Sequence, residues 1–258
     1  MAEPVTLSHV GKSFPSRQAA LPVLGDVTLS IPAGTFLAIL GPSGCGKSTL
    51  LRLIAGLDQP TTGTVRLGER VVTQADPRCA VVFQEPRLFP WLTVADNVAF
   101  GARRLAERPD PAELLELVGL GSFGRALPHQ LSGGMAQRAA LARALIGHPE
   151  VLLLDEPFAA LDALTRMQMQ DLVADVFLRL RPTVVLVTHD VDEALVLADR
   201  IVILGQRPAT IAATIDVPLP RPRDRGDVAL APLRAHVLSH FGLSHAAAPA
   251  APGPAAAH

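Results

Sequence analysis

A glycine-rich segment between an apolar run and a helical pattern places the strongest constraint on how this chain can fold. Residues 35–40 have the length and composition of a buried parallel strand, and residues 47–56 have helical spacing and a closing glycine. The segment between them follows the pattern G-x-x-x-x-G-K-[ST], whose glycines let consecutive backbone N–H groups point at phosphate oxygens. The sequence therefore predicts a phosphate-binding loop made of Gly41, Pro42, Ser43, Gly44, Cys45, Gly46, Lys47, Ser48 and Thr49.

The lysine of this loop stands out because Lys12 and Lys47 are the only lysines among 23 basic residues. Arginine is a planar fork suited to paired oxygens, whereas lysine is a compact charge that fits a narrow backbone cradle. We expect Lys47 to bridge the β- and γ-phosphates of a nucleotide and the Ser48 hydroxyl to bind Mg²⁺.

A second apolar run, residues 151–154, leads directly into two carboxylates, Asp155 and Glu156. Neighbouring side chains on a strand point to opposite sides, so the two carboxylates are expected to serve different purposes. We assign Asp155 to the Mg²⁺ shell and Glu156 to the general base that activates a water molecule.

The order of apolar runs and helical patterns predicts an α/β fold with a largely parallel sheet covered on both faces. The expected strands are residues 5–10, 27–31, 35–40, 80–83, 151–154 and 183–188. The expected helices are residues 47–56, 111–119, 133–147, 163–180, 191–198 and 228–241. The Pro/Arg-rich residues 218–225 predict a linker, and the Ala/Pro-rich residues 246–258 predict disorder.

Composition excludes several classes of protein. A net charge of −1 argues against a general nucleic-acid binder. Two cysteines, Cys45 and Cys79, cannot form a disulfide framework. The chain is 49% hydrophobic, yet no uninterrupted apolar run approaches the ~20 residues of a membrane-spanning helix. The apolar residues are therefore expected in a soluble core or against a protein partner.

The segment that begins at Leu131, LSGG, makes the resemblance to a known family specific. It opens a predicted helix, with Ser132 as N-cap and Gly133 and Gly134 leaving backbone amides uncovered. Between a phosphate loop and a strand ending in Asp-Glu, it resembles the signature of ABC-type ATPases. That resemblance implies that Ser132, Gly133 and Gly134 bind the γ-phosphate of ATP held by a second protomer.

The resemblance assigns further residues by their order in the chain. Gln84 matches the loop glutamine near Mg²⁺ and the attacking water, so the implied metal set is Ser48, Gln84 and Asp155. His189 matches the switch histidine, and the implied catalytic set is Glu156, His189, Gln84 and Lys47. Asp162 matches a loop that crosses the dimer interface. Phe14 matches the aromatic that stacks on adenine, with a place in the core as its alternative.

Two positions depart from the common family pattern. Met135 stands where many members have Gln, and Ala160 stands where Ser is common. The position of Met135 varies widely in the family, and the change at Ala160 is minor, so neither departure changes the assignment.

The resemblance also implies an architecture. The expected ABC ATPase domain covers residues 1–217, with a RecA-like P-loop core, an N-terminal antiparallel β-subdomain and a helical subdomain inserted at about residues 85–147. A linker and helix would follow at residues 218–243, and a disordered tail at residues 244–258.

Three stretches, residues 85–91, 161–166 and 215–223, are similar to the nitrate/sulfonate/taurine importer branch of the family. Such a subunit would hydrolyse ATP to power the import of a small solute, and sulfonate, taurine, nitrate and thiamine-precursor-like solutes all fit. It would form a homodimer when closed, bind a transmembrane permease, and serve an extracytoplasmic solute-binding protein indirectly. It would lie peripherally on the cytoplasmic face of the cell membrane and bind no nucleic acid. The apolar side chains at positions 88, 89, 91 and 92 are the expected permease contact, although Phe89 and Trp91 could instead fill the helical subdomain.

Two other functions fit parts of the pattern. A soluble ABC ATPase acting on DNA or ribosomes usually carries a long coiled-coil insertion or tandem ATPase units, which this sequence lacks. A regulatory module that binds ATP without hydrolysing it would not need Glu156 and His189.

Overall fold

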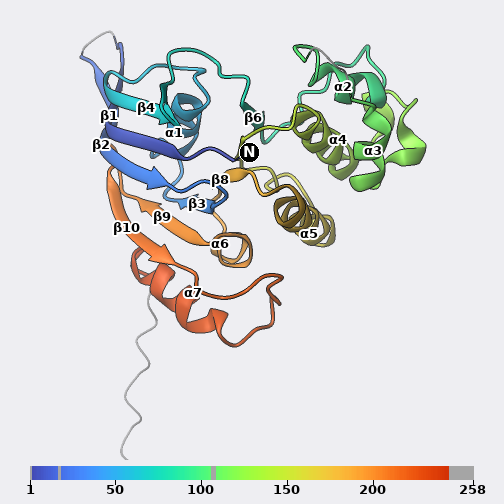
Figure 1. Cartoon of the computed structure of the whole chain (residues 1–258). Coiled ribbons are helices and arrows are strands. Elements are labelled where there is room, and N and C mark those ends of the chain that lie inside the picture. The colour runs from blue at the N-terminus through green and yellow to red at the C-terminus, as the bar shows by residue number, and fades with distance from the viewer. Residues whose placement is uncertain (1, 17–18, 106–108, 244–258) are drawn as a thin grey trace, which may run out of the picture.

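A computed structural model describes residues 2–16, 19–105 and 109–243 and contains two β-sheets flanked by helices (Figure 1). The smaller sheet has the strand order β2-β1-β4-β5 and is antiparallel. Its strands are β1 (Val5–Phe14), β2 (Leu21–Ile31), β4 (Thr62–Leu67) and β5 (Arg70–Val71). The larger sheet has the order β10-β9-β3-β8-β7-β6 and is parallel except for β10, which runs antiparallel to β9. Its strands are β3 (Phe36–Leu40), β6 (Cys79–Val82), β7 (Val151–Asp155), β8 (Thr183–Val187), β9 (Arg200–Leu204) and β10 (Ile211–Asp216).

Alternation along β3 divides the core into two layers. Phe36, Ala38 and Leu40 face a cluster shared with the helices α5, α6 and α7, whereas Leu37 and Ile39 face a cluster shared with α1 and the antiparallel sheet. All five residues of this strand are buried. A strand buried on both faces is what its continuous apolar sequence predicts.

The helices follow the predicted positions closely, except that the sequence pattern did not indicate α2. They are α1 (Lys47–Ile54), α2 (Val94–Phe100), α3 (Pro111–Leu117), α4 (Gly133–Leu145), α5 (Ala163–Leu180), α6 (Val191–Leu197) and α7 (Leu230–Ser239). None of the helices in the described residues is long and apolar enough to cross a membrane.

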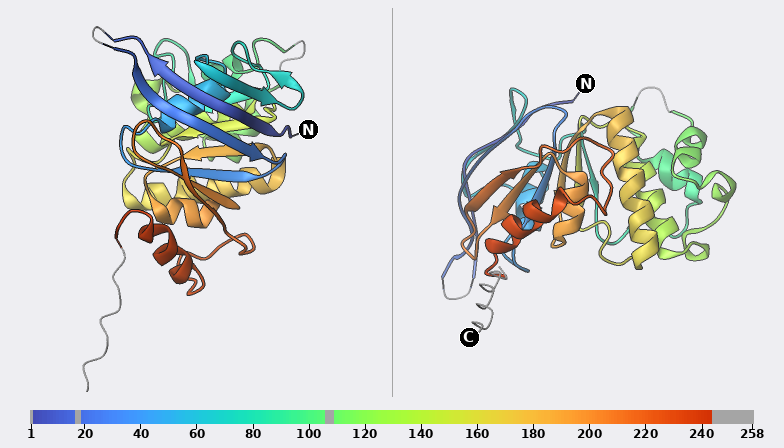
Figure 2. Two further views of the ribbon diagram at one scale, coloured as in Figure 1. Left: turned by 90° about the vertical axis from the view of Figure 1, so that its left-hand side faces the viewer. Right: turned by 90° about the horizontal axis from the view of Figure 1, so that it is seen from below.

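Helices α2, α3 and α4 form a group with an apolar cluster of its own, centred on Val98, Leu115 and Ala142. In Figure 1 this group lies on the side of the molecule opposite the antiparallel sheet, and the right-hand view of Figure 2 shows the same separation from below. Trp91 is 73% exposed, so it does not fill this cluster. Phe89 is half-buried, with its ring 4.5 Å from that of Phe100 and 5.6 Å from that of Trp91.

The predicted linker, residues 218–225, has no helix or strand, but it is bound firmly to the fold. Arg221 forms an ion pair with Asp199 at 2.6 Å and donates to the carbonyl oxygen of Leu197. Arg223 is buried and donates to carbonyl groups at the end of α6. The sequence predicted a linker without contacts to the fold, because proline and arginine favour exposed, extended chain. In the structure the arginines instead donate to the carbonyl oxygens at the end of α6. The predicted disordered tail, residues 244–258, lies outside the described residues.

Candidate nucleotide-binding and catalytic site

The glycine-rich loop joins the end of β3 to the start of α1, as predicted. Gly44 and Gly46 have positive φ angles of 74° and 121°, which side chains of L-residues rarely adopt. A Cβ atom at Gly41 would lie 2.9 Å from Cys45 Sγ and 3.0 Å from the carbonyl oxygen of Leu204. No side chain caps the first turn of α1, so its backbone N–H groups are left for an anion.

Lys47 lies inside the curve of this loop. Its side chain is 5% exposed, and Nζ donates to the carbonyl oxygens of Gly41 at 2.9 Å and Pro42 at 3.0 Å. The ammonium is thus held by two backbone dipoles beside the free N–H groups of α1. A compact charge fits this place, whereas a guanidinium is wider.

Ser48 and Asp155 meet although they are far apart in the sequence. Ser48 Oγ donates to Asp155 Oδ1 at 2.8 Å, because β3 and β7 flank β8 and their carboxyl ends reach the same edge of the sheet. Burial raises the pKa of Asp155, and the nearby charge of Glu156 raises it further, while the Ser48 hydrogen bond lowers it. The Ser48 hydroxyl and the half-buried Asp155 carboxylate are hard oxygen ligands that fit Mg²⁺, which binds few protein ligands and completes its shell with phosphate and water.

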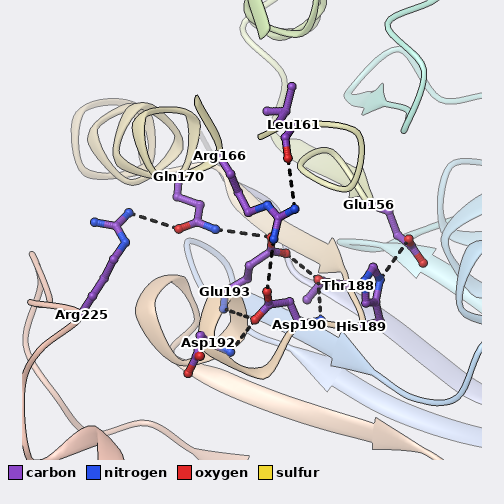
Figure 3. A network of polar contacts seen from close by, with 10 residues as sticks. All are labelled: Glu156, Leu161, Arg166, Gln170, Thr188, His189, Asp190, Asp192, Glu193 and Arg225. Atoms are coloured by element: carbon purple, nitrogen blue, oxygen red, sulfur yellow. Dashed lines mark hydrogen bonds and ion pairs between the residues drawn. The ribbon is translucent and has the colours of Figure 1, made fainter. Parts of the chain in front are cut away.

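Glu156 follows the end of β7 and points toward His189. Its φ is +47°, and its N–H donates to the carbonyl oxygen of Val187 at 2.9 Å. Glu156 Oε2 lies 3.2 Å from His189 Nδ1, as Figure 3 shows. The sequence predicts that Asp155 and Glu156 point in different directions because neighbouring side chains alternate along a strand. The left-handed backbone at Glu156 sets its direction instead, because the strand already ends at Asp155.

Gln84 lies two residues beyond the end of β6, the edge strand that pairs with β7. Its side chain is exposed. Gln84 therefore follows β6, and β6 is the neighbour of β7, which carries Asp155.

Ser132, Gly133 and Gly134 begin α4, and Ser132 is its N-cap. Ser132 Oγ accepts from the Met135 N–H at 3.3 Å. A Cβ at Gly133 would meet nothing within 4 Å, whereas one at Gly134 would lie 2.3 Å from Thr165 Cγ2. The glycines therefore differ, because Gly133 presents open backbone and Gly134 allows close packing on α5.

The segment 132–134 does not reach the glycine-rich loop of the same chain. The hollow beside that loop is lined by Pro42, Ser43, Gly44, Cys45, Gln206 and Arg207. Helix α1 packs on the antiparallel sheet, while α4 belongs to the helical group on the opposite side of the molecule (Figure 1). The glycine-rich loop and the start of α4 therefore lie apart from each other within one chain.

Asp162 and Phe14 are the remaining predicted residues. Asp162 is the N-cap of α5, and its carboxylate accepts from the Thr165 N–H at 3.0 Å, which lowers its pKa. Phe14 ends β1 and is half-buried, with Lys12 Nζ 4.8 Å from the centre of its ring. Phe14 therefore packs partly on the core and keeps part of its surface in solvent.

The sequence did not indicate the buried polar residues that lie beside the loop of His189. Thr188, Glu193 and Gln170 are buried and connected by hydrogen bonds (Figure 3). One signal was available, because Asp190 followed three residues later by Glu193 is the pattern of an acidic helix start. Arg207, which lines the hollow at the glycine-rich loop, had no comparable signal.

Comparison with known proteins identifies the family of the chain. The family model described as "ABC transporter" matches residues 24–159. The aliphatic sulfonates import ATP-binding protein SsuB 2 of Burkholderia lata is 53% identical over 220 residues, which cover 85% of this chain and 81% of that protein. SsuB 1 of Pseudomonas syringae pv. syringae is 52% identical over 223 residues, which cover 86% of this chain and 91% of that protein.

A solved structure gives the same result for the fold. The dimeric ATP-binding cassette MJ0796, in a post-hydrolysis state bound to ADP and Pi, matches with a TM-score of 0.73 and 33% sequence identity. The match covers 83% of this chain and 98% of that one. The chain therefore belongs to the ABC transporter family, and it is an ATP-binding ATPase with that family's P-loop fold.

Proposed function

We propose that this chain hydrolyses ATP to drive the import of an aliphatic sulfonate, or a similar small anion, through a separate transmembrane permease. The observation that carries this proposal is the identity of about half of all residues, over 85% of the chain, with a protein named as an aliphatic sulfonates import ATP-binding protein. Among the solutes considered from the sequence, this favours sulfonates, including taurine, over nitrate. Nothing comparable favours a DNA- or ribosome-associated ATPase.

The site residues suit phosphoryl transfer to water. In this proposal the backbone of residues 41–49 and the ammonium of Lys47 hold the phosphates of ATP. Ser48, Asp155 and Gln84 would hold Mg²⁺, which neutralises charge on the phosphate oxygens when bound. Glu156 accepts the proton of the attacking water, and His189 orients Glu156 and contacts the γ-phosphate. The distance of 3.2 Å between their side chains supports this pairing.

The site is completed by a second copy of the chain. Ser132, Gly133, Gly134 and Asp162 serve the ATP bound to the partner, and this fits the separation of residues 132–134 from the chain's own glycine-rich loop. The dimeric state of the related cassette supports the same arrangement. ATP would favour the closed homodimer because it contacts both copies there, and hydrolysis would remove that preference.

The permease contacts the helical group through Trp91. A tryptophan that is 73% exposed beside half-buried Leu88, Phe89 and Leu92 is typical of a protein-binding site. The chain would then lie on the cytoplasmic face of the membrane as a peripheral subunit. A solute-binding protein on the other side of the membrane would act on it only through the permease.

Uptake measurements test this function. The chain would be expressed with the sulfonate permease and binding protein of its source organism, and uptake of radiolabelled ethanesulfonate, taurine and nitrate compared. We expect uptake of ethanesulfonate that disappears with Lys47→Ala. ATP hydrolysis by the purified chain without uptake of any of the three solutes would refute the import of these anions.

A further inference from the structure

We propose that Glu193 is a positioning residue for the loop that carries His189, and that Gln170 and Arg225 hold Glu193 in the orientation this requires. The proposal rests on the proposed function in one respect, because it takes His189 to act in ATP hydrolysis. Glu193 acts on this loop through Thr188, to which it is hydrogen-bonded.

The hydroxyl of Thr188 lies at the centre of this arrangement. It donates to Glu193 Oε2 at 2.5 Å and accepts from the Asp190 N–H at 3.0 Å. These two hydrogen bonds fix the residues immediately before and after His189. Thr188 is 2% exposed and Glu193 is 5% exposed, so water does not replace either partner.

A second layer fixes the orientation of the Glu193 carboxylate. Gln170 Nε2, on α5, donates to Glu193 Oε1 at 3.4 Å. The carbonyl oxygen of the same amide accepts from Arg225 Nη2 at 3.1 Å, and Arg225 is itself paired with Asp171 at 2.7 Å. The amide of Gln170 therefore cannot rotate by half a turn without losing Arg225. Figure 3 shows the chain of contacts from Arg225 to Thr188.

Asp190 ties the same loop to the helices on either side. Its carboxylate accepts from the N–H groups of Asp192 at 2.8 Å and Glu193 at 3.2 Å, which starts α6. Arg166 Nη1 lies 3.8 Å from the Asp190 carboxylate, and Arg166 Nη2 donates to the carbonyl oxygen of Leu161 at 3.1 Å. The loop of His189 is thus connected to α5, to α6 and to the segment that follows Glu156.

The geometry has a specific consequence for the reaction. His189 is exposed and touches Glu156 at a single distance of 3.2 Å, so its placement depends on the backbone of residues 188–190. In the proposed function the glycine-rich loop makes most of the contacts with ATP, and His189 touches only the γ-phosphate. A disturbed loop should therefore slow hydrolysis and leave ATP affinity almost unchanged.

The decisive variant is Glu193→Gln, which keeps the shape of the side chain. If the new amide accepts from Thr188, its NH₂ group meets the NH₂ group of Gln170. If it turns round to accept from Gln170, it donates to Thr188 and leaves the proton of the Thr188 hydroxyl without an acceptor, so one hydrogen bond is lost in either orientation. Arg225 prevents Gln170 from turning to relieve this conflict. We expect kcat to fall about tenfold, with the Kd for MgATP unchanged within about twofold.

The double variant Glu193→Gln/Gln170→Glu provides the rescue. The amide at position 193 then donates to a carboxylate at position 170, which still accepts from Arg225. We expect this double variant to regain most of the wild-type kcat, although Gln170→Glu alone, which places two carboxylates together, should be slow. Failure of the double variant to exceed Glu193→Gln while folded would overturn the proposal.

Arg234→Met is the matched control. Arg234, on α7, pairs with Asp192, the neighbour of Glu193 on α6. It has no bond to Thr188, Gln170 or Glu193, so its removal should leave kcat unchanged. Circular dichroism and Tm would establish that each variant is folded. If Glu193→Gln does not fold, Arg225→Met replaces it, and we expect about a threefold loss of kcat; an unchanged kcat would overturn the proposal.

His189→Ala separates this inference from the proposed function. A wild-type rate in His189→Ala would refute the catalytic part of the proposed function. A slow His189→Ala together with a folded, fully active Glu193→Gln would refute only the positioning of the loop by Glu193. All variants would be measured as the full chain with MgATP.

Discussion

Arg223 offers a quantitative test of how the segment after β10 contributes to stability. Its buried guanidinium donates to the backbone carbonyl oxygens of Leu195, Val196, Ala198, Val217 and Leu219, at 2.6–3.4 Å. Burial lowers the pKa of Arg223 to about 10, so the side chain keeps its charge at neutral pH. One side chain therefore satisfies the carbonyl groups left free where α6 ends.

The substitution Arg223→Met removes these bonds and keeps most of the volume. Each buried acceptor left without a partner costs about 1–3 kcal/mol, but removing a buried charge and adding apolar contact offset part of this cost. Because the five carbonyls share one donor group, their losses are not additive. We expect the free energy of unfolding to fall by about 3 kcal/mol, with Tm lower by about 9 °C.

Urea denaturation followed by circular dichroism would measure this change. Arg223→Lys should lose about half as much, because an ammonium can donate three hydrogen bonds rather than five. Arg179→Met, at an exposed position on α5, is the control and should change stability by less than about 0.5 kcal/mol. A loss below about 1 kcal/mol in Arg223→Met would refute the claim that this arginine fixes the segment to α6.

Three further predictions concern other parts of the chain. Lys47→Arg should reduce ATP hydrolysis at least about tenfold, because a guanidinium does not fit the two-carbonyl cradle; near-normal phosphate release would contradict this. The hydrogen bond from Arg78 holds the pKa of Asp76 below its ordinary value of 3.8. The ionised Asp76 carboxylate therefore stabilises the folded chain above pH 3.8, and this contribution is lost as the pH falls through the lowered pKa. Asp76→Asn should therefore lower Tm at neutral pH and converge with wild type in strong acid, and a pH-independent difference in Tm would argue against this. Trp91→Ala should weaken co-purification with the permease while ATP binding persists, and unchanged assembly and uptake would exclude Trp91 as the contact.

The sequence was most informative where local chemistry determines local structure. The glycine-rich loop could be predicted because positive φ angles at Gly44 and Gly46 require glycine. The strands β3, β7 and β8 are buried on both faces, so each appears as a continuous apolar run. Asp155 and His189 could then be placed at the carboxyl ends of parallel strands.

The sequence was less informative where structure depends on distant contacts. β1 and β2 are longer than predicted because bulges, as between Leu7 and Val10, interrupt the alternation of their side chains. β10 is only half-buried at an edge of the sheet, so it lacks a strong apolar pattern. Arg223 and Gln170 gain their importance from carbonyl and carboxylate groups far along the chain, which no local pattern reveals.

The most direct test of the account is ATP hydrolysis by Glu156→Gln. The amide keeps the size of the side chain but cannot accept a proton from water, so the account predicts that phosphate release falls at least about a hundredfold. ATP binding should persist, and the mass of the chain in light scattering should double when MgATP is added, because the unhydrolysed nucleotide holds two copies together. A rate within about twofold of wild type would contradict the role of Glu156. A monomer at saturating MgATP would contradict the site shared between two copies.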